Sequence, residues 1–402
     1  MRLRTVTAAA GLAAIAATLV APATAGAHGL VGRTDLPIPD WLFTWGAAAV
    51  LVVSFVALAL AWPTPKLQRP ALHALPDGVN RAIGSRVVDI VCGAIGVAMF
   101  AFVLYAGLAG AQTVTANWAP TFVYVGFWLG LVPISLLFGD VFRAFNPWRA
   151  IGRAVGWVAG RVSSSVPEVL EYPRRLGYWP AAAGLLAFGW LEIVSTSGDQ
   201  PRTVAIATLI YSAATFTGMA LYGVEPWSRR GEAFGVYFGL FARMSPLERR
   251  DGRLGLRTPL SGLTGWEAGP GSVALLAVMI GVVSFDGLSA GKPFNDAIGG
   301  VITWMRDDLG VGPAQALQTV YAVSMLLAVA FAAGLFMLGM QGAHGVDRSH
   351  STRELARRFG HTLVPIALAY VAAHYVSLLL LQGQALAFLA SDPLGRGSDL
   401  FG

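Results

Sequence analysis

His374 is the residue of this chain whose type and position most favour chemistry. It lies near the middle of His361–Phe388, a stretch that is apolar enough and long enough to cross a bilayer. Tyr370, Ser377 and Gln384 stand at i−4, i+3 and i+10 from it, so a helix would place these side chains on one narrow face. Lipid offers no partners to such side chains, so we expect this face to meet other protein or water and to line a cavity.

Two acidic residues in other apolar stretches are expected at a similar depth. Glu192 and Asp286 fall in the outer third of their predicted spans, and neither span contains a basic residue. Two carboxylates and an imidazole can share a proton, act as acid and base, or bind a divalent cation such as zinc or copper. We therefore predict that Glu192, Asp286 and His374 form one catalytic or metal-binding site. The alternative is that each acid is protonated, or is satisfied by nearby hydroxyl groups or by water at the membrane edge.

His28 is a further candidate metal ligand because of the way the chain begins. A positively charged start precedes the short apolar stretch Ala8–Val20, and the small residues Ala25–Ala27 follow, as in a secretory signal peptide. Cleavage after residue 27 would leave His28 with an amine and an imidazole that can chelate copper or zinc. Cleavage two residues earlier and an uncleaved anchor are the alternatives. We expect a signal peptide at 1–27 and a single integral membrane domain at 28–402.

The composition is that of a membrane protein. Of 402 residues, 55% are hydrophobic and only 12% are charged, whereas soluble domains carry roughly 25% charged residues. We expect an all-α polytopic bundle of about eight transmembrane helices. The predicted spans are Trp41–Trp62, Val87–Gly110, Pro120–Phe138, Trp179–Thr196, Thr203–Gly223, Ser272–Ala290, Gln315–Gln341 and Thr362–Leu386. The single cysteine, Cys92, excludes an intrachain disulfide and a cysteine metal cluster.

The basic residues alternate from one loop to the next. With the mature N-terminus outside, most arginines fall in inner loops, and the outer side holds only Arg33, Arg202, Lys292, Arg306 and Arg396. This agrees with the positive-inside rule, so the net charge of +6 reflects topology rather than nucleic-acid binding. We predict a multi-pass protein of the plasma membrane, with the lipid bilayer as its partner and both mature termini extracytoplasmic.

Two inner segments have the spacing of amphipathic helices. Trp148, Ile151, Val155 and Val158 make an apolar stripe after the first cluster of inner arginines, and Phe234, Tyr237, Phe238 and Phe241 make another. Both predict helices that lie in the membrane interface, where aromatic rings sit at headgroup depth. The outer segment Gly291–Gly312 is too short and too charged for a span and predicts a surface helix or a lid.

The chain contains the stretches Leu137–Asp140 with Asn146–Arg149, Ser284–Gly287, Val364–Ala367 with Ala373–Tyr375, and Ser391–Gly395. In these stretches it resembles a family of polytopic actinobacterial membrane proteins commonly named fenitrothion hydrolase. The similarity covers most of the chain from about Asp140 onward. The resemblance implies hydrolysis of an organophosphorus triester, for which a metal-activated water is a common nucleophile. Glu192, Asp286, His374 and His28 would then be the ligands.

Three classes of function remain open from the sequence. The first is a metal-assisted hydrolase with an outward-facing site for a small-molecule substrate. The second is a proton- or cation-coupled transporter that uses the same acids and histidine. The third is a non-catalytic membrane subunit. No P-loop, nucleophile elbow, HExxH sequence or dinucleotide-binding glycine pattern occurs in its required context.

Overall fold

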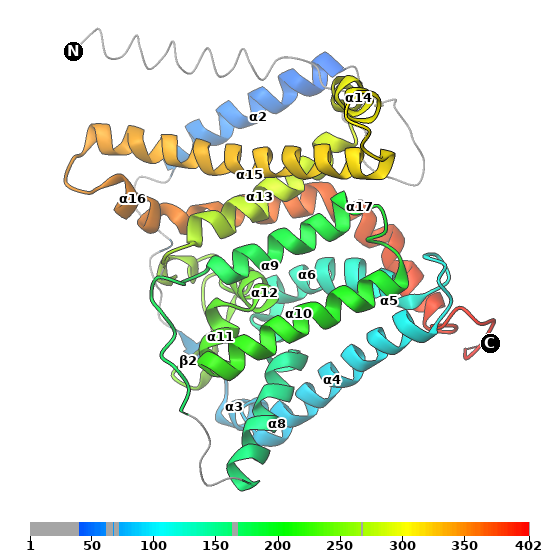
Figure 1. The fold of residues 1–402 in the computed structure, drawn as a ribbon. Helices are drawn as coiled ribbons and strands as arrows, with labels where there is room; N and C mark the ends of the chain where they lie inside the picture. The colour runs from blue at the N-terminus through cyan, green and yellow to red at the C-terminus, as the bar shows by residue number, and fades with distance from the viewer. Residues whose placement is uncertain (1–39, 62–66, 68–71, 163–167, 267, 402) are drawn as a thin grey trace.

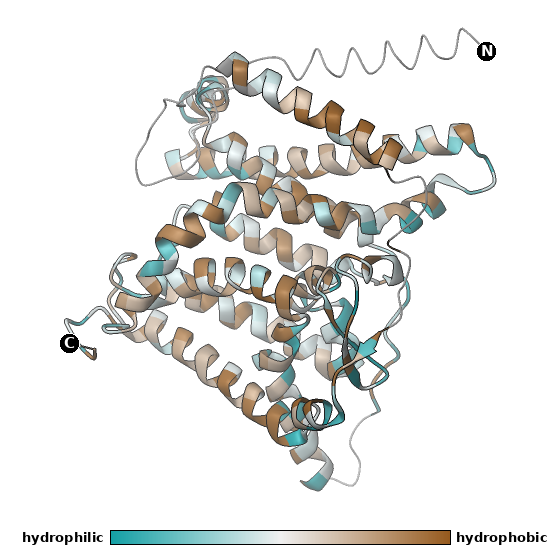
Figure 2. Cartoon of the chain, turned by 180° about the vertical axis from the view of Figure 1, so that it is seen from behind, coloured by the Kyte–Doolittle hydropathy of each residue, from teal (hydrophilic) through white to brown (hydrophobic). Residues whose placement is uncertain are grey.

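The chain folds into a stack of helices that run nearly side by side (Figure 1). The computed structural model describes residues 40–61, 67, 72–162, 168–266 and 268–401. The predicted signal peptide and His28 lie outside these residues. Hydrophobic residues dominate the long helices, and hydrophilic ones gather in the loops and around a small sheet (Figure 2). This distribution is that of a membrane protein.

Seven helical stretches in the described part of the chain are long and apolar enough to cross a membrane. They are α2 (Asp40–Ala61), α4 (Arg86–Ala109), a composite of α5 (Trp118–Thr121), η1 (Phe122–Leu129) and α6 (Leu131–Phe138), α10 (Pro201–Tyr222), α13 (Ser272–Ser289), α15 (Pro313–Val346), and α16 (Thr352–Phe359) with η4 (Gly360–Thr362) and α17 (Leu363–Leu389). The remaining predicted span corresponds to a shorter apolar helix, α9 (Trp179–Gly189), continued by η2 (Trp190–Val194).

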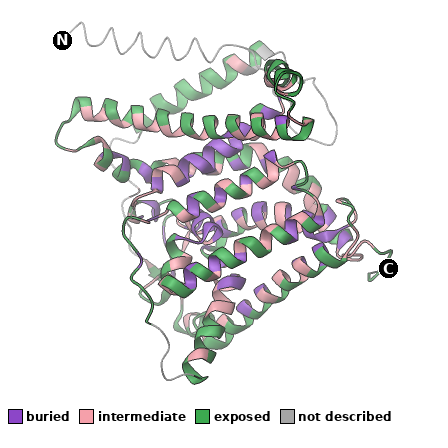
Figure 3. Ribbon diagram, in the orientation of Figure 1, coloured by how far each residue is buried: buried purple, intermediate pink, exposed green. Residues whose placement is uncertain are grey.

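Helix α13 is the centre of the bundle. It packs against α9, α15 and α17, and most of its side chains are buried, whereas those of α2 are exposed (Figure 3). The sequence of α13 is apolar around its whole circumference, which suits a helix surrounded by other helices. Gly281 allows the closest approach, because a β-carbon there would lie 2.6 Å from the α-carbon of Val329 on α15. The core of the molecule therefore forms around α13.

One of the two predicted interfacial helices is instead buried in the core. Helix α12 (Ala233–Ala242) carries Phe234, Tyr237, Phe238 and Phe241, and all four are buried. The prediction of an interfacial helix here is wrong because the residues between the aromatics are also apolar or glycine, so every face of α12 can meet protein.

Charged side chains cap both ends of α12. The carboxylate of Glu232 accepts hydrogen bonds from the backbone N–H groups of Phe234 and Gly235. At the other end, the guanidinium of Arg257 donates to the carbonyl oxygens of Ala242 and Arg243. Each charge has the sign that the helix dipole favours. Because its terminal backbone groups are satisfied in this way, a ten-residue helix can begin and end inside the bundle.

The other predicted interfacial segment forms the amphipathic helix α8 (Pro147–Val162). Trp148 at its start is buried, and Val155 and Val158 are exposed. Arg149 and Arg153 on its other side pair with Asp89 of α4, and Arg149 also pairs with Glu225 of α11 (Val224–Arg230). These ion pairs hold α4, α8 and α11 together.

The remaining elements lie at the ends of the long helices. The outer segment forms α14 (Lys292–Asp307), an amphipathic helix without buried residues, as expected for a surface helix. Strands β1 (His73–Ala74), β2 (Leu247–Arg250) and β3 (Arg253–Leu256) form an antiparallel sheet in the order β1-β3-β2. The short helices are α3 (Asp77–Ile83), α7 (Val141–Phe145) and the 3₁₀ turn η3 (Leu263–Gly265).

Candidate functional site

Helices α13 and α17 bring Asp286 and His374 into direct contact. Nε2 of His374 lies 2.8 Å from Oδ2 of Asp286. The hydroxyl of Tyr375 donates to the same oxygen over 2.7 Å. The imidazole and the phenol come from consecutive residues of α17, whose side chains project about 100° apart on a helix. Two neighbouring faces of α17 therefore converge on one carboxylate.

Tyr375 is not among the site residues predicted from the sequence, yet its side chain is the most closely packed of this group. Its side chain is buried, and its ring meets that of Trp128 edge to face with the centroids 4.9 Å apart. The ring of His374 lies edge to face against it at 4.5 Å. Residues three or four positions from His374 share its helix face, whereas Tyr375, the next residue, does not. The sequence signal that could have identified Tyr375 is its phenolic hydroxyl deep within an apolar span.

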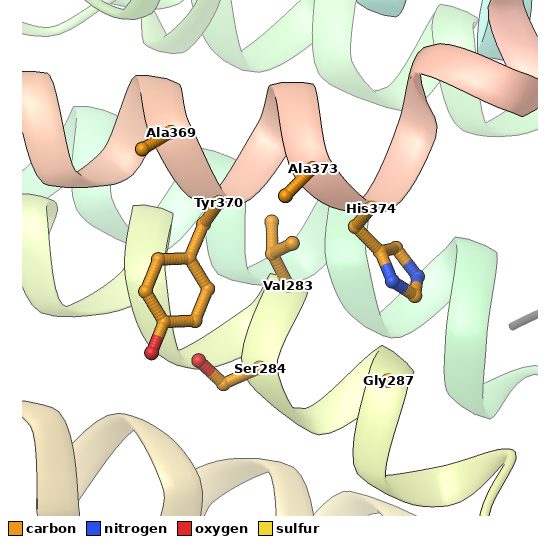
Figure 4. A pocket seen from close by; sticks show the side chains of 7 residues that line it. All are labelled: Val283, Ser284, Gly287, Ala369, Tyr370, Ala373 and His374. Carbon is orange, nitrogen blue, oxygen red and sulfur yellow. The ribbon is translucent and has the colours of Figure 1, made fainter. Parts of the chain in front are cut away.

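A groove of about 580 Å³ lies between α13 and α17 beside His374. Its lining residues are Val283, Ser284, Gly287, Ala369, Tyr370, Ala373 and His374 (Figure 4). A β-carbon at Gly287 would lie 3.6 Å from both Cε1 and Nδ1 of His374. The missing side chain of Gly287 thus keeps space open beside the imidazole edge that faces away from Asp286. Nδ1 makes no hydrogen bond to any residue that the structure describes.

The far end of the groove carries two hydroxyl groups. The hydroxyl end of Tyr370 points toward the side chain of Ser284 in Figure 4. Oγ of Ser284 donates to the carbonyl oxygen of Ile280 over 2.8 Å. Tyr370 is 44% exposed, and no residue within the described ranges shares a hydrogen bond with its hydroxyl. This phenol is therefore able to donate to a bound molecule.

The predicted polar face of α17 does not act as one unit. Tyr370 and His374 line the groove, whereas Ser377 and Gln384 are exposed and do not line it. Nε2 of Gln384 instead donates to the carbonyl oxygen of Leu380 on its own helix, over 3.1 Å. For Gln384 the reason is length, because α13 ends at Ser289, one turn after Asp286, whereas Gln384 lies ten residues after His374.

Glu192 lies near the group but does not touch His374 or Asp286 by any hydrogen bond found among the described residues. It belongs to the π-helical segment η2, and its Oε2 atom is buried without a hydrogen-bond partner. Its charge is close enough to Asp286 and Tyr375 to act on both electrostatically. Trp128, which packs on Tyr375, belongs to the other π-helical segment, η1. Such segments occur often at functional sites.

The donors do not fit the predicted metal site. Across the ranges that the structure describes, no three or more His, Cys, Asp or Glu side chains are grouped so that they could hold a metal ion. Oδ2 of Asp286 already meets both the imidazole of His374 and the hydroxyl of Tyr375. Glu192 does not complete a set with them, and His28 lies outside the described residues. The arrangement is that of a carboxylate–imidazole pair instead.

Comparison with known protein families, with curated proteins and with solved structures finds no match to this chain.

Proposed function

We propose that this chain is a multi-pass protein of the plasma membrane that carries out acid–base chemistry on a small molecule in the groove between α13 and α17. One observation carries the proposal. Asp286 binds Nε2 of His374 at 2.8 Å, and Nδ1, the other ring nitrogen, lies on the side of the ring that borders the groove. A carboxylate on one ring nitrogen fixes the tautomer and supports a positive charge on the ring. The other nitrogen can then take up a proton from a bound molecule.

The reaction that we propose is hydrolysis of a neutral phosphotriester, the reaction that the sequence resemblance implies. Nδ1 of His374 removes a proton from a water molecule as the oxygen of this water forms a bond to phosphorus. The bond from phosphorus to the leaving oxygen breaks, and the proton passes from the imidazolium to that oxygen. Asp286 stabilises the imidazolium, and Tyr375 positions Asp286.

Turnover of diethyl 4-nitrophenyl phosphate by protein in lipid nanodiscs tests this proposal. We expect release of 4-nitrophenolate by the wild type and a loss of about a hundredfold to ten-thousandfold in His374→Gln. The matched control is His361→Gln, since His361 lies on the same polypeptide stretch but outside the groove. No turnover by the wild type, or equal turnover by His374→Gln, contradicts the proposal.

A chelator distinguishes this chemistry from the metal-assisted alternative. Because the described donors do not group as a metal site, we expect dialysis against EDTA to leave the turnover rate unchanged. A rate that falls on dialysis and returns with added zinc or copper would restore the metal hypothesis, with Asp286 and His374 as the first ligands to vary.

A proton-coupled transporter is the second candidate, and the position of Glu192 favours it. A buried carboxylate oxygen without a hydrogen-bond partner, close to a second carboxylate, can store a proton and release it. Proteoliposomes that contain a pH-sensitive dye test this function. Substrate-driven acidification that disappears in Glu192→Gln, without any hydrolysis, would favour the transporter over the hydrolase.

A further inference from the structure

The groove lies between two apolar helices, beside the last two turns of α13 and the middle of α17. Its walls are positions 283–287 of α13 and 369–374 of α17, and both helices are long and apolar enough to cross a membrane. Its lining residues Ala369, Tyr370 and Ala373 are exposed, and the same two helices expose the apolar side chains of Ile366, at 44%, and Leu288, at 53%. In a bilayer such a surface contacts acyl chains. The groove therefore opens toward lipid.

The lining of the groove has little to offer a charged ligand. Among its seven lining residues, His374 is the only one with a readily ionised side chain, and none is Lys, Arg, Asp or Glu. A charge placed there would lose its hydration without gaining a permanent counter-charge, at a cost of several kcal/mol. An uncharged molecule avoids this cost. It can still accept a hydrogen bond from Tyr370 at one end and meet Nδ1 of His374 at the other.

We propose that the groove admits uncharged, lipophilic esters sideways from the bilayer, a substrate class that rests on the proposed function of the His374–Asp286 pair. The apolar part of the ester lies along Ala369 and Ala373, and its polar centre lies between Tyr370 and His374 (Figure 4). The bilayer concentrates such molecules beside the opening, so a modest affinity is sufficient. Charged esters dissolved in water are excluded by the same lining.

Photolabelling in nanodiscs tests this inference separately from catalysis. The probe is diethyl 4-benzoylphenyl phosphate, a neutral triester with a photoreactive ketone, and its control is the dianionic 4-benzoylphenyl phosphate. We expect adducts of the neutral probe on the groove-lining residues and about tenfold less labelling by the dianion. Gly287→Leu and Ala373→Leu fill the groove from opposite walls, and each should reduce labelling several-fold. Two filling variants are needed in case one of them fails to fold.

The outcome for His374→Gln separates the two proposals. We expect this variant to lose turnover but to keep the adducts, because the groove retains its shape. Adducts with no turnover by the wild type leave the binding inference standing and overturn the hydrolase. Equal labelling by both probes, adducts outside the groove, or cross-links that join two copies of the chain through this face would overturn the lateral binding site.

Discussion

Two carboxylates of this bundle, one buried and one half-buried, each meet a tyrosine hydroxyl, but their surroundings differ. The carboxylate of Glu232 accepts hydrogen bonds from Tyr211, from Asn146, and from the backbone N–H groups of Phe234 and Gly235. Glu232 is fully buried. Asp286 meets Tyr375 and His374, and the side chains of Asp286 and His374 keep 15% and 17% exposure.

The difference separates a structural site from a reactive one. Every partner of Glu232 is an internal group, and two of these partners are N–H groups in the first turn of α12, so its hydrogen bonds fix the fold. The partner of Asp286 has a second ring nitrogen that faces a groove. A carboxylate inside the bundle becomes available for chemistry here because its partner His374 reaches an open space.

The largest expected effect is on turnover when Asp286 is changed. Asp286→Asn preserves the shape of the side chain but removes the charge that supports the imidazolium of His374. We expect turnover to fall about a thousandfold or more, with little change in the thermal unfolding midpoint. Steady-state release of 4-nitrophenolate and a melting curve on the same sample check both parts. A variant that unfolds but keeps its turnover per folded molecule would place Asp286 with the structural carboxylates.

The largest expected effect on stability comes from the opposite end of α12. Arg257 is buried, pairs with Glu248 at 3.1 Å, and caps the last carbonyl groups of α12. Arg257→Met leaves the carbonyl oxygen of Arg243 without its donor and removes one of the two arginine partners of Glu248, which keeps its pair with Arg250. We therefore expect a loss of about 2 kcal/mol in the free energy of unfolding. Denaturant unfolding in detergent measures it. Turnover per folded molecule should not change, and a specific loss of turnover would link α12 to the chemistry.

Removal of the hydroxyl of Tyr375 should have an intermediate effect. Tyr375→Phe deletes one hydrogen bond to Asp286 but keeps the ring against Trp128. We expect a loss of about 1 kcal/mol in transition-state stabilisation, or several-fold in kcat, with KM nearly unchanged. Tyr321→Phe is the matched control, because Tyr321 packs against Phe285 of α13 without meeting Asp286 through any hydrogen bond in the described ranges. Equal effects of the two variants would remove the positioning role of Tyr375.

The smallest expected effect is that of Gly287→Ala. The added β-carbon would lie 3.6 Å from the imidazole, which is ordinary van der Waals contact, so the helix needs no rearrangement. We expect KM to rise a few-fold because the methyl group occupies part of the groove, while kcat stays close to that of the wild type. Michaelis constants for a short and a long trialkyl ester show the effect, which should be greater for the bulkier one. A large fall in kcat would mean that Gly287 does more than leave space.

The sequence predicted the long helices well because their signal is local. Runs of apolar residues near 20 in length mark them, and the scarcity of ionisable residues inside the spans directed attention to Asp286 and His374. The position of α12 was not predictable in the same way. Its aromatic spacing at Phe234, Tyr237 and Phe238 is the same whether the face meets lipid or protein.

The details of the site also depend on packing that spacing does not encode. Gln384 shares a helix face with His374, yet it lies beyond the part of α17 that α13 accompanies. Ser377 shares the same face but is exposed and does not line the groove. Tyr375 lies on a different face from that stripe and still reaches Asp286, because α13 approaches between two faces of α17. The packing of two helices thus decided which polar residues joined the site.

One paired measurement tests the distinction between the two carboxylate sites most directly. Turnover per folded molecule and the thermal unfolding midpoint are measured together for His374→Gln and Glu232→Gln in identical nanodiscs. We predict that His374→Gln loses about a thousandfold in turnover at a nearly unchanged midpoint. Glu232→Gln should instead lose stability, because its amide NH₂ cannot accept from the N–H groups that begin α12, and should keep its turnover. If Glu232→Gln loses turnover while folded, or His374→Gln keeps it, the account is contradicted.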